Sequence, residues 1–224
     1  MGAVFRKVTI FISLIFYLAS LSFVICACMT DFWIVSEIFN ESGPHIGSGR
    51  VNSGLINGMR EMDWGLGTRY IPFSVFTEIQ DGISFYDRVL WIFILFFIAL
   101  GILWICVGMV TSLLSAFVAE EETVAGPIGM YLWSLLALLS LTAACIIFYI
   151  EFQTSMQKNL LTADQIQAGY STQGQVKLGY SFYFMLGALL ALYFPPLLVF
   201  VSSERRKQRN SPRTPSIDPT ALLY

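Results

Sequence analysis

The sequence predicts an all-α membrane protein, a four-helix transmembrane bundle with a small extracellular antiparallel β-sheet in its first loop. Four apolar stretches contain no charged residue, and each can cross a hydrocarbon core of about 30 Å as a helix. They run over residues 8–29, 89–111, 128–150 and 181–202. The composition agrees, because a chain that is 56% hydrophobic and 12% charged lies outside the range of soluble domains. The spans hold no ionisable group of the kind that proton relays and ion pathways use.

The charges beside the spans predict the orientation of a single domain, residues 1–224. Basic residues flank the first and fourth spans on one side: Arg6 and Lys7, then Arg205, Arg206, Lys207, Arg209 and Arg213. Lys and Arg accumulate on the cytosolic side. Both termini are therefore expected in the cytosol, with a cytosolic loop 112–127 and a cytosolic tail 203–224. Segments 30–88 and 151–180 become the extracellular loops.

The first apolar stretch also resembles a secretory signal peptide, because Cys26-Ala27-Cys28 imitates a small-residue cleavage site. A signal peptide has an apolar region of about 7–15 residues, and this stretch is longer. An uncleaved first helix is therefore predicted. The second apolar run continues to Val118, which predicts a helix that tilts or projects beyond the membrane.

Strand signals appear in the first loop, where glycines separate short segments. Trp33–Ile38 and Tyr70–Phe76 have strand-like composition, and Pro72 favours an edge position for the second. In the second loop, Leu160–Ile166 is expected to extend the third helix outward. Aromatic residues near the predicted membrane boundaries are expected to act as interfacial anchors: Trp33, Trp91, Trp133, Tyr149 and Tyr180.

Small residues four apart allow helix backbones to approach closely. The pairs are Gly108 and Ser112, Ser140 and Ala144, and Gly187 and Ala191. We expect them to pack the bundle internally rather than to mark a homodimer face.

The sequence points away from an enzyme, and no cofactor, metal or small-molecule substrate is predicted. The four cysteines, Cys26, Cys28, Cys106 and Cys145, all fall inside predicted spans and are expected to serve as small packing residues. Cys26 and Cys28 point to nearly opposite sides of a helix and cannot pair with each other. A membrane thiol oxidoreductase using Cys26, Cys28 and Cys145 is the alternative. His45 is the only histidine and has no local ligand spacing.

Three sets of residues are candidate sites outside the membrane. Asn40-Glu41-Ser42 is a glycosylation sequon in the first extracellular loop. Arg205, Arg206, Lys207 and Arg209 either set the topology or contact anionic lipid headgroups of the bilayer. The C-terminal Leu222, Leu223 and Tyr224 suit the groove of a PDZ-type scaffold, which takes a free C-terminus as an added strand.

The chain resembles the clarins, within the wider claudin-like group of four-span proteins, over nearly its whole length. Phe32-Trp33-Ile34 is similar to the Trp-Ile that follows the first clarin helix, and the chain ends in Leu-Leu-Tyr as clarins do. The other matching motifs, in order, are Ser53–Gly58, Trp64–Arg69, Phe73–Phe76, Gly126–Trp133 and Gly179–Phe182.

One departure from the family concerns cysteines. The hearing-associated clarins have two loop cysteines at positions that match Asn40 and Trp64 here. The cysteine-free loop and the Tyr-Ser-Phe start of the fourth span resemble the third vertebrate clarin or a divergent homologue. The claudin signature, Gly-Leu-Trp with a spaced cysteine pair, is incomplete, which argues against tight-junction strands.

The resemblance implies a non-enzymatic plasma-membrane protein that assembles with other membrane proteins and with the actin-rich cortex. Known clarins serve the projections and ribbon synapses of sensory hair cells. A claudin-like cell-adhesion protein or channel-auxiliary subunit is the alternative function.

Overall fold

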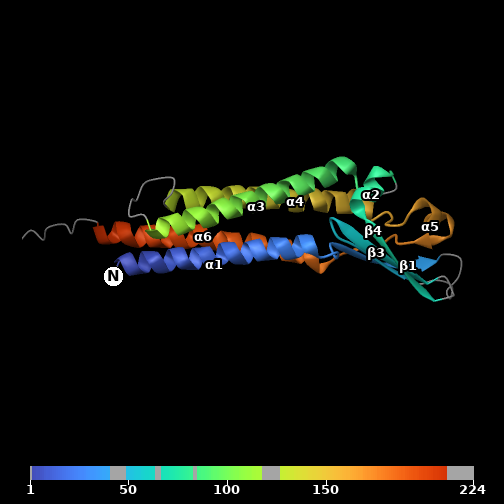
Figure 1. Cartoon of the computed structure of the whole chain (residues 1–224), viewed down its shortest axis with the longest axis horizontal. Helices are drawn as coiled ribbons and strands as arrows, with labels where there is room; N and C mark the ends of the chain where they lie inside the picture. The colour runs from blue at the N-terminus through green and yellow to red at the C-terminus, as the bar shows by residue number, and fades with distance from the viewer. Residues whose placement is uncertain (1, 41–48, 64–66, 83–84, 118–126, 211–224) are drawn as a thin grey trace, which may run out of the picture.

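The computed structural model describes residues 2–40, 49–63, 67–82, 85–117 and 127–210. Long helices lie side by side, and a sheet stands at the end of the bundle away from the N-terminus (Figure 1). The long helices are α1 (Gly2–Met29), α3 (Arg88–Phe117), α4 (Pro127–Glu151) and α6 (Tyr180–Asn210). Short helices α2 (Val75–Gln80) and α5 (Ala163–Gln167) and the π-helical turn η1 (Phe152–Met156) lie at the sheet end.

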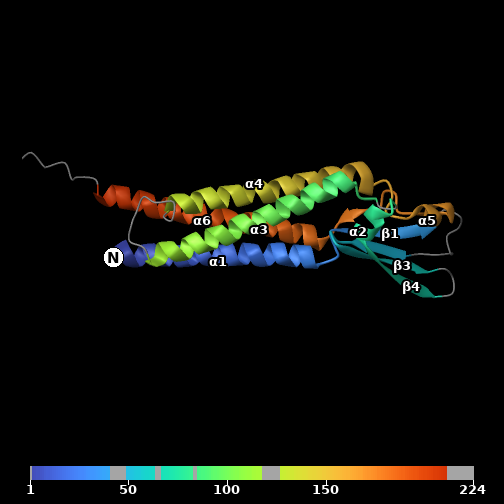
Figure 2. The same cartoon turned by 45° about the horizontal axis from the view of Figure 1, so that its top comes forward.

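Four helices are long and apolar enough to cross a membrane. Their apolar windows are Lys7–Met29, Arg88–Ser115, Gly129–Met156 and Tyr180–Val201. Helices α3 and α6 each pack against both α1 and α4, so the four helices form a closed ring (Figure 2). Large apolar side chains such as Phe11 and Leu190 are more than half exposed on the outside of this ring. That surface suits contact with lipid tails, and the chain is a multi-pass membrane protein.

The small residues lie inside the bundle, as predicted. Ser112, Ser140, Ala144 and Ala191 are buried. A Cβ added at Gly108 would lie 2.8 Å from the ring of Tyr17, so glycine at this position lets α1 approach α3 closely.

Hydroxyl groups also join the helices across the bundle. The fully buried Tyr17 hydroxyl on α1 lies 2.5 Å from the Ser134 hydroxyl of α4, and it donates to the carbonyl of Met130 at 3.1 Å. Ser20 of α1 donates to the carbonyl of Ala188 in α6 at 3.0 Å. The hydroxyl groups of Tyr17, Ser134 and Ser20 thereby each have a partner inside the bundle, which avoids a desolvation penalty.

The sheet has six strands over the described residues, with the order β4-β3-β2-β1-β5 and with β6 also paired to β1. All pairings are antiparallel. The strands are β1 (Ile34–Asn40), β2 (Gly49–Ser53), β3 (Asn57–Asp63), β4 (Thr68–Ser74), β5 (Tyr170–Ser171) and β6 (Lys177–Leu178). The predicted strands correspond to β1 and β4, but Val75 and Phe76, predicted as the end of the second strand, belong to helix α2. β4 is an edge strand, as Pro72 indicated.

The second loop differs from its prediction. Leu160–Ile166 is expected from the sequence to extend the third helix, but it comes after η1, and part of it forms the separate helix α5. The two-residue strands β5 and β6, which follow α5, both pair with β1. These strands are too short to carry a period-two sequence pattern. They form because β1 would otherwise leave the backbone groups of one edge unpaired.

Two of the predicted interfacial anchors are core residues instead. Trp33 is 1% exposed, and Trp91 is also buried. Each indole N–H has a backbone acceptor inside the protein, at 2.7 Å on Ala27 and 2.8 Å on Leu55 respectively. An indole that finds its hydrogen bond within the fold has no need of the membrane interface.

Candidate functional site at the sheet end of the bundle

Most of the sequence-predicted sites lie at positions whose side chains the structure does not describe. Asn40 is the last residue of β1, with its backbone opposite Tyr170 of β5, and the rest of its sequon is outside the described residues. The basic residues Arg205, Arg206, Lys207 and Arg209 belong to the last part of α6, but their side chains lie outside the described set. Leu222, Leu223 and Tyr224 also lie outside it.

The described residues form a dense set of contacts at the joint between the sheet and the bundle. The Trp33 ring packs edge-on against Phe148 of α4 and Phe182 of α6, with centroid distances of 4.7 and 6.0 Å. The backbone of Trp33 donates to the carbonyl of Ser53 in β2 and accepts from Gly179 just before α6. One residue therefore connects α4, α6 and the first two strands, and it fixes the base of the sheet on the helices.

A buried ion pair fixes the short helix α2 to the sheet. The guanidinium group of Arg60 in β3 donates to both carboxylate oxygens of Glu78 in α2, at 2.5 and 2.9 Å. It also lies 4.0 Å from the ring centroid of Phe73 in β4. Arg60 is only 3% exposed. This two-point contact determines where α2 lies on the sheet, and the Phe73 ring covers the guanidinium as in a cation–π pair.

A second buried acid joins the start of α3 to the end of α4. Glu151 is fully buried, and one of its carboxylate oxygens accepts the backbone N–H of Asp87 at 2.7 Å. The neighbouring Tyr86 hydroxyl donates to the carbonyl of Gly54 at 2.9 Å. Burial raises the pKa of Tyr86 well above its ordinary value, so this hydroxyl stays protonated and remains a donor. The contacts hold the α2–α3 connection against both the sheet and α4.

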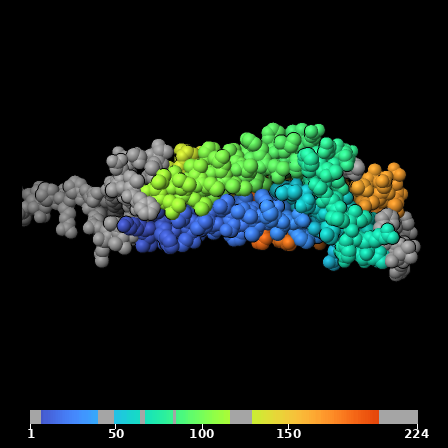
Figure 3. Space-filling view, viewed as in Figure 1, coloured from blue at the N-terminus to red at the C-terminus, as the bar shows by residue number. Residues whose placement is uncertain are grey.

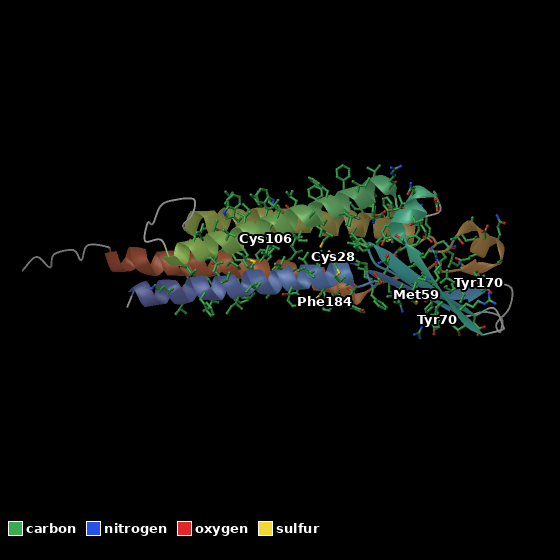
Figure 4. The ribbon with its side chains drawn as sticks, in the orientation of Figure 1. Cys28, Met59, Tyr70, Cys106, Tyr170 and Phe184 are labelled. Carbon is green, nitrogen blue, oxygen red and sulfur yellow. The ribbon has the colours of Figure 1, made fainter. Side chains whose placement is uncertain are left out.

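One face of the sheet is covered and the other is exposed. On the covered face, Arg60 meets α2, and the sulfur of Met62 accepts a hydrogen bond from Gln165 of α5 at 3.3 Å. On the opposite face, Glu37, Arg50, Glu61 and Tyr70 form a row across four strands. We call this face, from Met59 to Tyr70, the outward face. Tyr70 is 63% exposed, and Figure 4 shows it with Met59 on the side away from α5.

The edge strand β4 has the longest run of exposed residues among the described strands. Its residues from Thr68 to Pro72 are exposed, and only one of its edges is paired. Tyr70 and Ile71 present large apolar side chains on this strand. Figure 3 shows the residues coloured for β3 and β4 on the surface at the sheet end. An exposed apolar edge strand is a ready contact surface for another chain.

A groove of about 560 Å³ lies at the base of the outward face. Asp31 and Phe32, between α1 and β1, form one side, and residues of β2, β3 and β4 form the other. Asn52 fixes this wall by donating from its side-chain amide to the carbonyl of Asp31 at 2.9 Å. Burial raises the pKa of Asp31 above its ordinary value of 3.8.

The cysteines differ in exposure, which corrects the single packing role predicted for them. Cys145 is buried and Cys28 is partly buried, whereas Cys26 and Cys106 are exposed. Lipid-facing thiols are tolerated because a thiol behaves as a small apolar group. Within the described residues, all four cysteines are free and no cluster of three metal-ligating side chains occurs.

Sequence patterns did not identify Arg60, Glu151 or Asp31 as important. Arg60 is two residues from both Gly58 and Met62 along β3 and shares their buried face, so the period-two pattern of the strand indicates an inward-facing charge. Its partner Glu78 belongs to another element, so the pair is visible only in the fold. Glu151 directly follows an apolar span, where a carboxylate ordinarily contacts water or headgroups.

Comparison with known protein families identifies the family of the chain. A family model described as Clarin-2-like matches residues 5–159. This stretch includes the first three membrane helices and the four first-loop strands, and it confirms the resemblance to clarins. No curated protein matches the chain in a direct sequence comparison. The similarity to a third vertebrate clarin stays a prediction. Since the matched stretch is more than half of the sequence and the fold is a four-helix bundle with a first-loop sheet, the chain belongs to the Clarin-2-like family of four-span membrane proteins.

Proposed function

We propose that the protein is a non-enzymatic organiser of membrane protein assemblies at the plasma membrane. Its sheet contacts neighbouring membrane proteins, and its tail links them to the actin-rich cortex. The observation that supports this proposal is a contrast within the sheet: its base is fixed on the helices, whereas its edge strand β4 is exposed. Trp33, Arg60 and Tyr86 hold the sheet in one position on the bundle, while Tyr70 and Ile71 remain exposed. A rigidly held apolar surface loses little entropy when a partner binds.

The orientation belongs to the same proposal, with both termini cytosolic and the sheet outside. The basic residues after the fourth span support it. Glycosylation of Asn40 would occur only if the first loop is in the secretory lumen during synthesis. Replacing Asn40 with Gln should then abolish a glycosidase-sensitive shift in gel mobility. A glycan that persists in Asn40→Gln contradicts the assignment of this site. If the orientation is correct, the N-terminus should also be protected from protease added outside intact cells.

The partner contacts are tested by proximity labelling from the cytosolic tail. Three forms are compared: the full chain, a form without residues 221–224, and the double variant Tyr70→Ser, Ile71→Ser. We expect the truncated form to lose cytosolic scaffold proteins and the double variant to lose membrane proteins. Exposed Ile166 of α5, changed to Ser, is the matched control. If neither set of neighbours changes relative to this control, the sheet and the tail are not the contact surfaces.

The tail carries the link to the cortex in this proposal. Tyr224 and Leu222 are the apolar last and third-last side chains that a PDZ-type groove accepts. The basic residues Arg205, Arg206, Lys207 and Arg209 place this segment against anionic headgroups of the inner leaflet. The resemblance to clarins adds sensory-cell projections and ribbon synapses as the setting in which to make the measurement.

A claudin-like adhesion protein or channel-auxiliary subunit is the second candidate. The free edge of β4 favours it, because an unpaired edge strand can add to a strand of a chain on an opposing cell. Pro72 in the middle of that edge opposes it, since proline cannot donate a hydrogen bond to a new strand. Cell aggregation separates the two functions. Homotypic aggregation that the double variant abolishes supports adhesion, and its absence supports lateral assembly within one membrane.

A further inference from the structure

The groove at the base of the outward face has the position of a lipid headgroup site. Asp31 comes two residues after Met29, where the apolar window of α1 ends. Thr30 and Ser181, at the start of α6, join their hydroxyls at 2.7 Å beside the groove. The opening therefore lies at the level where two membrane windows end, which is the level of the headgroups in that leaflet.

The charge of the groove selects the kind of headgroup. Asp31 is the single charged residue among those that line it. The Arg60–Glu78 ion pair does not involve Asp31, and no basic side chain of the described residues lies within ion-pair distance of the Asp31 carboxylate. The raised pKa of Asp31 has the same origin, because burial removes water from the carboxylate without supplying a positive charge. A cationic group in the groove would provide that charge.

An aromatic path leads from the groove into the membrane region. Phe32 stacks on Tyr180 of α6 with a centroid distance of 4.9 Å. Tyr180 then meets Phe184 edge-on at 5.7 Å, and Phe184 stacks with Phe23 of α1 at 6.2 Å. Tyr180 and Phe23 are partly exposed. In Figure 4, Phe184 on the bundle and Met59 on the sheet both lie toward the lower edge of the view, with the joint between them.

These observations point to one occupant. We propose that the groove binds the ammonium headgroup of a phospholipid in the leaflet at the sheet end, with an acyl chain along the Phe184 and Phe23 rings. The ammonium lies against the Asp31 carboxylate and the Phe32 ring, a pairing that aromatic rings and carboxylates both favour. The side-chain amide of exposed Asn57, at the rim, donates to the phosphate. An anionic headgroup without an ammonium is repelled by Asp31.

The test uses the full chain in lipid nanodiscs with photoactivatable phospholipid probes. A phosphatidylcholine probe is compared with a phosphatidylglycerol probe, which has a similar phosphate but no ammonium. The variant Asp31→Asn removes the charge with little change in shape. Glu37→Gln is the matched control, because Glu37 is an exposed carboxylate on the same face but beyond the base. We expect Asp31→Asn to lower phosphatidylcholine labelling about fivefold, the factor that about 1 kcal/mol represents, and Glu37→Gln to leave it unchanged.

A second variant tests the aromatic contact separately from the charge. Phe32→Leu retains an apolar side chain and removes the ring, and it should also lower phosphatidylcholine labelling. Thermal unfolding of each variant identifies any loss of structure. Equal labelling by the two probes in the wild type, or unchanged labelling in both variants, overturns the proposal.

Competitors distinguish the headgroup from the acyl chains. Soluble phosphocholine that reduces labelling supports a headgroup site. Competition by diacylglycerol but not by phosphocholine overturns it in favour of purely apolar binding.

Discussion

Strands β1 and β4 belong to one sheet but stand in opposite environments. β1 has partners on both edges, and its Ile34 and Ile38 are buried against the core. β4 has a partner on one edge only, and five of its residues in sequence are exposed. The difference indicates a division of roles. Changes near β1 should lower the stability of the fold, whereas changes on β4 should leave the fold intact and alter contacts with other molecules.

The largest effect is expected beside β1. Trp33→Ala removes a side chain that is 1% exposed, two edge-on aromatic contacts and a buried hydrogen bond. Such a truncation costs about 3–5 kcal/mol of the free energy of unfolding. Thermal unfolding in detergent measures it. Tyr70→Ala on β4 is the control and should change stability by less than about 0.5 kcal/mol. Equal losses in the two variants would remove the distinction between the strands.

The ion pair behind β3 should come next. Glu78→Gln leaves the Arg60 guanidinium buried with a weaker acceptor, and loss of one member of a buried pair costs about 3 kcal/mol or more. The expected loss is toward the lower end because Glu78 is 13% exposed. Arg50→Gln, on the exposed outward face, is the matched control and should have little effect. Replacing both members, as Arg60→Met with Glu78→Leu, should recover much of the stability, since no unpaired charge remains.

A smaller effect is expected within the bundle, where two glycines provide a matched pair. Gly108→Ala places a methyl group 2.8 Å from the Tyr17 ring, which is held in place by Ser134. Overpacking of this kind costs about 1–3 kcal/mol. At Gly187 the same methyl group would lie 3.8 Å from Phe23, an ordinary contact. Gly187→Ala should therefore be neutral or slightly stabilising because alanine favours helix. Comparable unfolding temperatures for the two variants would contradict this.

The smallest effect concerns Asp31 and depends on pH. Because burial raises its pKa in the folded state, the folded protein binds this proton more tightly than the unfolded chain does. Stability is therefore lost as pH rises from the unfolded pKa through the raised one. Asp31→Asn should have a slightly higher unfolding temperature than the wild type at pH 7, and the gap should shrink below pH 4. A lower unfolding temperature for Asp31→Asn than for the wild type at pH 7 would contradict this, because it would show that a cation partner stabilises the Asp31 carboxylate.

Much of the fold follows from local sequence patterns. Charge-free stretches of membrane length predict the four helices, and the β-rich composition around Ile34 and Tyr70 predicts two strands. Pro72 predicts the edge because its ring removes a donor wherever it stands. These features depend on properties of single residues or of contiguous segments, so a sequence displays them directly.

The candidate site does not follow in the same way. Trp33 resembles an interfacial anchor in sequence, and it becomes core because Phe148 and Phe182, more than a hundred residues away, surround it. β5 and β6 are strands only because β1 offers an unpaired edge. The Asp31 groove exists because the segment after α1 lies beside residues of three strands, β2, β3 and β4.

By itself, therefore, the sequence determined a four-span membrane protein with a strand-forming first loop and a proline-marked edge. The tertiary structure decided which aromatic residues are buried, how Arg60 is neutralised and which strands surround Asp31 after the end of α1. The physical reason is the range of the interactions. Hydrophobic length and proline chemistry act within a segment, whereas burial and charge pairing depend on which segments meet.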